Sequence, residues 1–191
     1  MTLHNEMHEL FGKNLIQASA RQVENINISE KSLHFLRTTG LPSEYESLFL
    51  KFSLGFSSLS SLSSKREQLY VLGIEYDFET EKLYQSSRTE VNDCSLIYAY
   101  ICIGIDRDSE NILAIDESGL SECFVNTNII CFAQSLIAYK KMECRIDANV
   151  DNDEEIHQAI EDFENQLREI DPDVLTNEEG WWLSVINGIY G

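Results

Sequence analysis

The centre of the chain, residues 97–125, constrains the fold more than any other part. It holds three apolar runs rich in β-branched residues: Ile97–Ile105, Asn111–Asp116 and Leu120–Val125. The first two runs are separated only by the polar residues 106–110, and the last two by residues 117–119. Connections this short join neighbouring strands that run antiparallel. We therefore predict a β-meander here, preceded by a strand over residues 69–74.

Before the meander, three helices are predicted from apolar spacing and capping residues. An amphipathic helix is predicted over residues 3–18, and Ser29 can cap a second helix that Gly40 closes. Pro42 suits the first turn of a third helix, because its missing N–H would have no partner there. The face of that third helix would be formed by Tyr45, Leu48, Phe49 and Phe52.

After the meander, helical patterns return. Thr127 or Asn128 can cap one helix, and an apolar stripe over residues 156–170 predicts another, which ends before Pro172. A terminal helix is expected to carry Trp181, Trp182, Val185, Ile186 and Ile189. We expect both tryptophans to pack in the core, with exposure at a binding surface as the alternative. The order of elements indicates the α+β class, with a central antiparallel β-meander sheet flanked by N-terminal and C-terminal helices.

One domain over residues 1–191 is expected, because 191 residues are few for two domains. The hydrophobic fraction of 43% is sufficient for one core, and no internal repeat divides the chain. Three peripheral segments are expected: an N-terminal helical extension at 1–28, a Ser-rich loop at 53–66 and an acidic linker at 145–155.

The net charge excludes two classes of partner. Lys and Arg number 14 against 33 Asp and Glu, which gives a formal net charge of −19. Direct binding to nucleic acid or to an anionic membrane surface is not expected, because both are recognised by basic residues. Two interpretations stay open: charge that keeps the protein soluble, or a field that steers in a basic partner.

The cysteines and the N-terminus predict a cytoplasmic protein. Five cysteines, an odd number without a C-x-x-C pair, indicate free structural thiols in a reducing compartment. The first residues lack the basic and apolar regions of a signal peptide. The longest apolar stretch, Leu96–Ile105, is about half as long as a membrane-spanning helix, so no membrane association is expected.

No catalytic or cofactor motif is found, so we predict that the protein is not an enzyme and binds no cofactor or metal. His4 and His8 lie one helical turn apart, but no third ligand is near them in the sequence. The run from Asp147 resembles the start of a calcium loop. However, Asn152 and Gln158 occupy the positions that require Gly and Glu.

The densest negative charge of the sequence is an acidic run that we take as the candidate partner-binding site. Its residues are Asp147, Asp151, Asp153, Glu154 and Glu155. A solvated helix N-terminus is the alternative, because acidic residues stabilise the positive end of a helix dipole.

Several stretches together are similar to one known family. They are Gly40–Phe49 (GLPSEYESLF), Asn111–Asp116, the Gly119 turn, Phe124–Thr127 (FVNT), Phe132–Leu136 (FAQSL), Ile170–Leu175 and Trp181–Ile186. The chain resembles the SUKH (Smi1/Knr4-like) superfamily over roughly residues 29–190, and most closely its SUKH-4 type. These positions turn strands, cap helices and dock helices on a sheet, so the resemblance identifies a scaffold and not a site.

The resemblance implies an immunity protein that binds and neutralises a cognate secreted polymorphic toxin by stoichiometric occlusion. Such toxins are often nucleases or nucleic-acid deaminases and tend to be basic, which agrees with an inhibitor of charge −19. A monomer or weak dimer is expected. The alternatives are a non-enzymatic regulatory or scaffolding protein of the Smi1/Knr4 type, or a ligand-binding module, which a deep dry pocket would favour.

Overall fold

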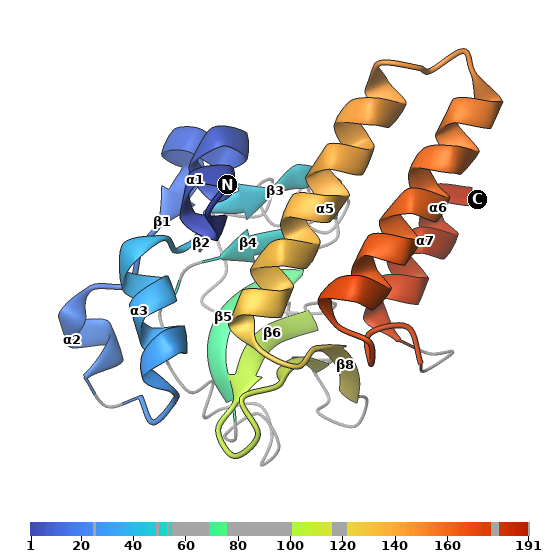
Figure 1. The fold of residues 1–191 in the computed structure, drawn as a ribbon. Coiled ribbons are helices and arrows are strands. Elements are labelled where there is room, and N and C mark those ends of the chain that lie inside the picture. The colour runs from blue at the N-terminus through green and yellow to red at the C-terminus, as the bar shows by residue number, and fades with distance from the viewer. Residues whose placement is uncertain are drawn as a thin grey trace, which may run out of the picture.

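The computed structural model shows a sheet covered by helices (Figure 1). The described residues are 1–24, 26–48, 50–52, 54, 69–75, 101–115, 122–176 and 180–190. Their α-helices are α1 (Leu3–Phe11), α2 (Ala20–Val23), α3 (Glu30–Thr38), α5 (Ile129–Asp147), α6 (Asp153–Ile170) and α7 (Trp181–Tyr190). In Figure 1, α1, α2 and α3 lie on one side of α5, and α6 and α7 lie on the other. The predicted α+β class is confirmed.

Six strands form an antiparallel sheet in the order of the chain. They are β3 (Glu44–Tyr45), β4 (Leu50–Phe52), β5 (Leu69–Glu75), β6 (Ile101–Asp106), β7 (Ile112–Ile115) and β8 (Glu122–Asn126). The central strands β6 and β7 are buried along most of their length, so their sequences are continuous apolar runs without alternation. The predicted meander is confirmed for these strands, while residues 97–100 and 116–121 lie outside the described part. So does the expected Ser-rich loop apart from Leu54.

The turn between β6 and β7 is held by its own side chains and by α3. Asp106 Oδ1 accepts hydrogen bonds from the backbone N–H groups of Asp108 (3.1 Å) and Ser109 (2.8 Å). The Glu110 carboxylate accepts from the Ser29 N–H (2.7 Å) and from the Ser29 and Ser32 hydroxyls (3.0 Å each). This carboxylate therefore joins the predicted turn to the N-terminus of α3.

The helix predicted over residues 3–18 is wrong beyond Phe11. The chain leaves the helix at Gly12, whose φ of +54° favours glycine. A short 3₁₀ turn, η1 (Gly12–Asn14), follows, and β1 (Leu15–Ile16) then pairs antiparallel with β2 (Leu41–Pro42). The apolar spacing continues past the helix because Leu15 and Ile16 pack against the same core.

The third predicted helix, starting at Pro42, is also wrong. Residues 41–52 form β2, β3, the 3₁₀ turn η2 (Glu46–Leu48) and β4. Gly40 has a φ of +79°, and a Cβ there would lie 1.9 Å from the Ile16 carbonyl oxygen, so the backbones of β1 and β2 approach closely at this point. The short apolar run fits the periodicity of a helix and also that of a strand. Residues 41–42 and 50–52 form strands because they pair with neighbouring strands.

Helices α5 and α6 form an antiparallel hairpin whose core is aromatic. Asn128 caps α5 as predicted, since its Oδ1 accepts from the N–H groups of Ile130 and Cys131 (3.0 Å each). Tyr139 of α5 and Trp182 of α7 make edge-to-face contacts with Phe163, with ring centroids 5.6 Å and 5.7 Å away, respectively. Trp182 is fully buried, and the predicted packing role of the tryptophans is confirmed. Within the described residues, no helix combines the length and apolarity needed to cross a membrane.

A buried polar cluster, here called the hairpin root, joins β8, α5, α6 and α7. Asn126 donates to Ser135 Oγ (3.2 Å) and to Asp171 Oδ2 (3.0 Å), and it accepts from the Trp182 indole N–H (3.1 Å). Asp171 Oδ2 also accepts from the Thr127 N–H (2.7 Å). Asp171 Oδ1 is buried without a partner among the described residues, while the bonds of Oδ2 and of Asn126 tie the ends of the four elements together. Because a buried polar group is costly without partners, these bonds fix the direction in which α5 and α6 leave the core.

Candidate partner-binding surface

The acidic run predicted as a binding site lies at the free end of the α5–α6 hairpin. Residues 147–155, here called the hairpin tip, comprise the last residue of α5, a turn and the first turn of α6. The segment expected as an acidic linker is thus mostly helix with a short turn at 148–152. Figure 1 shows this end of the hairpin projecting away from the sheet, at the opposite end of α5 from β8.

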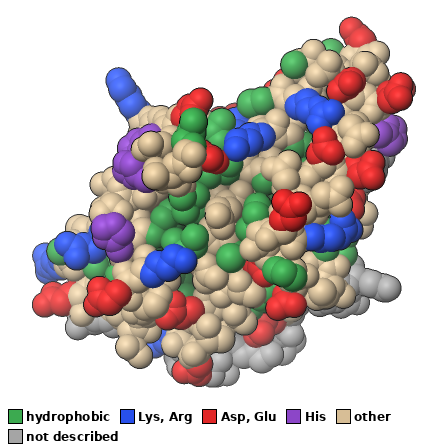
Figure 2. All heavy atoms as spheres, in the orientation of Figure 1, with side chains coloured by type: hydrophobic (Ala, Val, Ile, Leu, Met, Phe, Trp, Pro, Cys, Tyr) green, Lys and Arg blue, Asp and Glu red, His purple; other side chains and the backbone are tan. Residues whose placement is uncertain are grey.

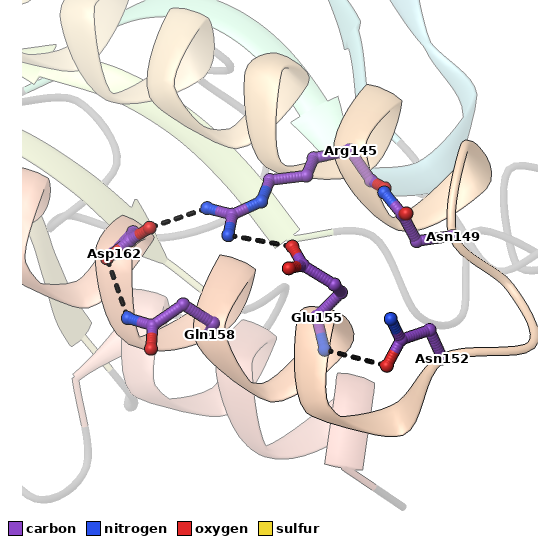
Figure 3. Close-up of polar contacts among 6 residues, drawn as sticks. All are labelled: Arg145, Asn149, Asn152, Glu155, Gln158 and Asp162. Atoms are coloured by element: carbon purple, nitrogen blue, oxygen red, sulfur yellow. Dashed lines mark hydrogen bonds and ion pairs between the residues drawn. The ribbon is translucent and has the colours of Figure 1, made fainter.

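The turn is ordered by asparagine hydrogen bonds. The Asn149 side chain donates to the Arg145 carbonyl oxygen (2.8 Å), and its backbone N–H donates to the Ile146 carbonyl (2.9 Å). Asn152 is the N-cap of α6, and its Oδ1 accepts from the Glu155 N–H at 3.3 Å (Figure 3). Both helix ends next to the turn therefore have partners for part of their free backbone groups.

Arg145 of α5 connects the two helices behind the tip (Figure 3). Its guanidinium donates to Asp162 Oδ2 (2.5 Å) and to Glu155 Oε2 (3.1 Å), both on α6. Gln158 donates to the second oxygen of Asp162 (3.0 Å). The hydrogen bonds from Arg145 and Gln158 lower the pKa of Asp162, and those to Asp162 and Glu155 raise the pKa of Arg145. The Arg145 bridge holds the two helices in one relative position at the tip.

The structure brings the five predicted residues together but divides them into two groups. Glu155 is half-buried and is paired with Arg145, which also pairs with Asp162. The other four are exposed and form no ion pair with any lysine or arginine among the described residues: Asp147, Asp151, Asp153 and Glu154. Uncompensated carboxylates that point into solvent give the tip a strong negative potential, which can attract a cationic surface.

Val150 adds an apolar group at the apex of this negative surface. Its exposed fraction is 64%, and Met1 is the other large hydrophobic residue with such exposure in the described part of the chain. An exposed valine alone is ordinary on protein surfaces. It lies between Asp147 and Asp153 in the chain, so the tip presents one apolar side chain beside its carboxylates.

The negative surface continues along α6. Exposed Glu161 and Glu169 extend it, whereas Glu164 is paired with Arg168 at 3.1 Å. Figure 2 shows acidic side chains along this hairpin with a few Lys and Arg side chains among them, and it shows both acidic and basic side chains over the N-terminal helices. Residues 129–170 hold ten Asp and Glu against four Lys and Arg, whereas residues 1–48 hold six against four. The larger excess of negative charge on the hairpin can attract a basic partner to it.

The structure also locates the two histidines considered as metal ligands and four of the five cysteines. His4 and His8 contact each other with ring centroids 4.4 Å apart, and His4 Nδ1 lies 3.2 Å from the Thr39 hydroxyl. In the part of the chain that the structure describes, no group of three His, Cys, Asp or Glu has the geometry of a metal site. Four of the cysteines are described, and no disulfide joins any two of them: Cys102, Cys123, Cys131 and Cys144.

Sequence reasoning missed the Arg145 bridge, although the sequence contains a signal for it. Arg145 and Glu155 lie five positions before and after Val150. In an antiparallel helical hairpin, residues at equal distances from the turn face each other, so opposite charges there predict a bridge between helices. This symmetry becomes visible only when the turn has been located.

One comparison with known proteins gives a match. The sequence model of the SUKH-4 immunity protein family matches residues 2–188. No curated protein and no solved structure matches the chain significantly.

Proposed function

The chain belongs to the SUKH-4 immunity protein family, and from that membership we propose that it neutralises a cognate secreted toxin by covering the toxin's basic active-site face with the hairpin tip. The inhibitor and the toxin form a one-to-one complex in the cytoplasm, without turnover. The toxin is a nuclease or a nucleic-acid deaminase, whose substrate phosphates require a cationic cleft.

The observation that carries this proposal is the set of four exposed tip carboxylates that pair with no lysine or arginine of the described residues. A cleft that binds phosphates presents Lys and Arg side chains at short intervals. Carboxylates spaced along a turn and the first turn of a helix can occupy those positions as nucleic-acid phosphates do. Occlusion then requires no catalytic group on the inhibitor, in agreement with a family that is generally non-enzymatic.

The Arg145 bridge supports the same proposal through rigidity. A surface loop loses conformational entropy when it binds, and this loss subtracts from the affinity. At the tip, the bonds of Asn149, Asn152 and Arg145 order the turn before any partner arrives. The carboxylates therefore enter the complex with little additional ordering.

The test begins with the toxin, captured from lysates of the host and of neighbouring strains and identified by mass spectrometry. The purified toxin is mixed with the wild-type protein and with the triple variant Asp151→Lys, Asp153→Lys, Glu154→Lys. We expect association with the variant to be about tenfold to a hundredfold slower at low salt, because steering is reversed. The rate is measured by stopped flow at several salt concentrations, together with the toxin's enzymatic activity.

The control variant carries the same change of net charge elsewhere: Glu9→Lys, Glu24→Lys, Asp108→Lys. These three residues are exposed and lie away from the tip. If the control slows association as much as the tip variant, net charge and not the tip determines binding. If the captured partner is a large cytosolic assembly and no toxin is inhibited, the regulatory or scaffolding alternative is correct.

A further inference from the structure

A second surface feature lies at the other end of α5, where α1, α3 and α5 enclose a hollow of about 540 Å³. Its floor is apolar and is formed by Leu3, Phe35 and Ile130. Its rim carries His4, Lys31 and His34. Figure 2 faces this hollow and shows hydrophobic side chains between the N-terminal helices and α5, with histidine and basic side chains beside them. We call it the α3 hollow.

The α3 hollow has an exceptional charge for this chain. No Asp or Glu is among its lining residues, although the sequence holds 33 of them. Lys31 and His34 are exposed, and neither takes part in an ion pair with another described residue. The rim therefore offers N–H donors and the positive charge of Lys31, which pairs with no carboxylate of the described residues. An occupant that carries carboxylates can accept hydrogen bonds from these donors and can also pair with the positive charge.

The form of the hollow indicates that its occupant belongs to a larger molecule. Phe35 at the floor has an exposed fraction of only 4%, so the hollow does not extend deeper into the core. An occupant can therefore contact the floor with one side only. Pockets for small molecules enclose most of the ligand surface. A shallow apolar floor suits a side chain whose opposite side is covered by the protein that carries it.

We infer that the α3 hollow binds an acidic segment of a protein partner, with one apolar side chain on the floor and carboxylates at Lys31, His34 and His4. The chemistry of this inference depends only on the residues of the hollow. Its extension to the toxin, as the protein that supplies the segment, rests on the proposed function.

Helix α5 sets the distance between this hollow and the hairpin tip. Ile130 lies in the first turn of α5 and Val150 just beyond its end, which corresponds to about 30 Å at the helical rise per residue. That distance is comparable to the diameter of a small domain. One partner can therefore contact both ends, with a basic face at the tip and an acidic segment at the hollow. Opposite charge requirements at the two ends exclude a reversed orientation.

The inference is tested on the full-length protein with a defined probe. The probe is an acetylated, amidated pentapeptide with a central phenylalanine and two glutamates on each side. In a two-dimensional ¹⁵N NMR titration, we expect the amide signals of Leu3, Lys31 and Thr39 to move. The variant Lys31→Glu should bind the peptide about fivefold more weakly, as for an exposed ion pair near the upper end of its range.

The matched control is Lys13→Glu, which makes the same charge change at an exposed residue outside the hollow. It should leave the peptide affinity unchanged. Because Lys31 and Lys13 are both exposed, neither change removes a buried contact, and the NMR spectra report directly that each variant is folded.

Three outcomes overturn the inference: equal binding of a peptide with lysines in place of the glutamates, signal changes outside the hollow, or binding of dodecanoate but not of the acidic peptide. A different result separates the two proposals. If the acidic peptide binds but Lys31→Glu leaves the toxin affinity unchanged, the segment does not come from the toxin, and the tip proposal is unaffected. Loss of toxin binding in the tip variant alone likewise leaves the hollow's chemistry intact.

Discussion

Carboxylates are buried at one end of the α5–α6 hairpin and exposed to solvent at the other. At the root, Asp171 is 1% exposed and its Oδ2 accepts two hydrogen bonds from neighbouring elements. At the tip, Asp151 and Asp153 are exposed and have no cationic partner in the described part of the chain. The root carboxyl group is buried and hydrogen-bonded through one oxygen, whereas the tip carboxylates lie in water without a Lys or Arg partner among the described residues. The comparison predicts that root substitutions change stability and tip substitutions change binding.

Removing the root amide should have the largest effect on stability. Asn126→Ala deletes bonds to Ser135, Asp171 and Trp182, so that the indole N–H loses its acceptor in the core and Asp171 Oδ2 keeps only the bond from the Thr127 N–H. We expect the free energy of unfolding to fall by about 3 kcal/mol, measured by urea denaturation followed by circular dichroism. The control Asn165→Ala, on the exposed face of α6, should change it by less than about 0.5 kcal/mol. Equal effects of the two variants would contradict a structural role for the root.

Removing the Arg145 bridge should have an intermediate effect that depends on pH. Arg145→Gln deletes the bonds to Asp162 and Glu155 and should lower the melting temperature slightly at neutral pH. Because Arg145 lowers the pKa of Asp162, the stabilisation is complete above the ordinary value of 3.8 and is lost as the pH falls through the lower pKa of the folded state. The difference in melting temperature between wild type and variant should therefore shrink below about pH 4. A difference independent of pH would show that Arg145 acts through packing.

Changing the apex should have the smallest effect on stability. Val150→Ser alters a side chain that is 64% exposed, so the free energy of unfolding should stay within about 0.5 kcal/mol of the wild type. Dissociation of the toxin should become faster while association and its salt dependence are unchanged, because the apolar contact forms after the charges have met. Surface plasmon resonance separates the two rates. A slower association would mean that Val150 orients the tip before contact.

The parts of the fold that could be predicted from sequence are those with local causes. The caps at Ser29 and Asn128 and the turn at residues 106–110 depend on neighbouring residues, and the structure confirms them. The acidic tip could be located for the same reason, because its residues are close in the sequence. Whether those residues bind a partner stays a prediction.

The parts that could not be predicted depend on contacts between distant residues. The paired strands β1 and β2 require Gly40 to approach Ile16, and no local pattern shows this. The root joins Asn126 to residues 45 and 56 positions later in the chain. The α3 hollow combines three helices whose individual sequences read as ordinary amphipathic faces.

The bond between Trp182 and Asn126 makes the root visible to spectroscopy. The chain has two tryptophans, both buried and in contact with each other at 4.7 Å between ring centroids. Their intrinsic fluorescence therefore comes entirely from the place where α7 docks on the root. Departure of α7 into water would shift the emission to longer wavelength, whereas an event at the distant tip would leave it constant. Tryptophan emission thus reports on the packing of the root without any added label, and we expect it not to respond to the charges at the other end of the hairpin.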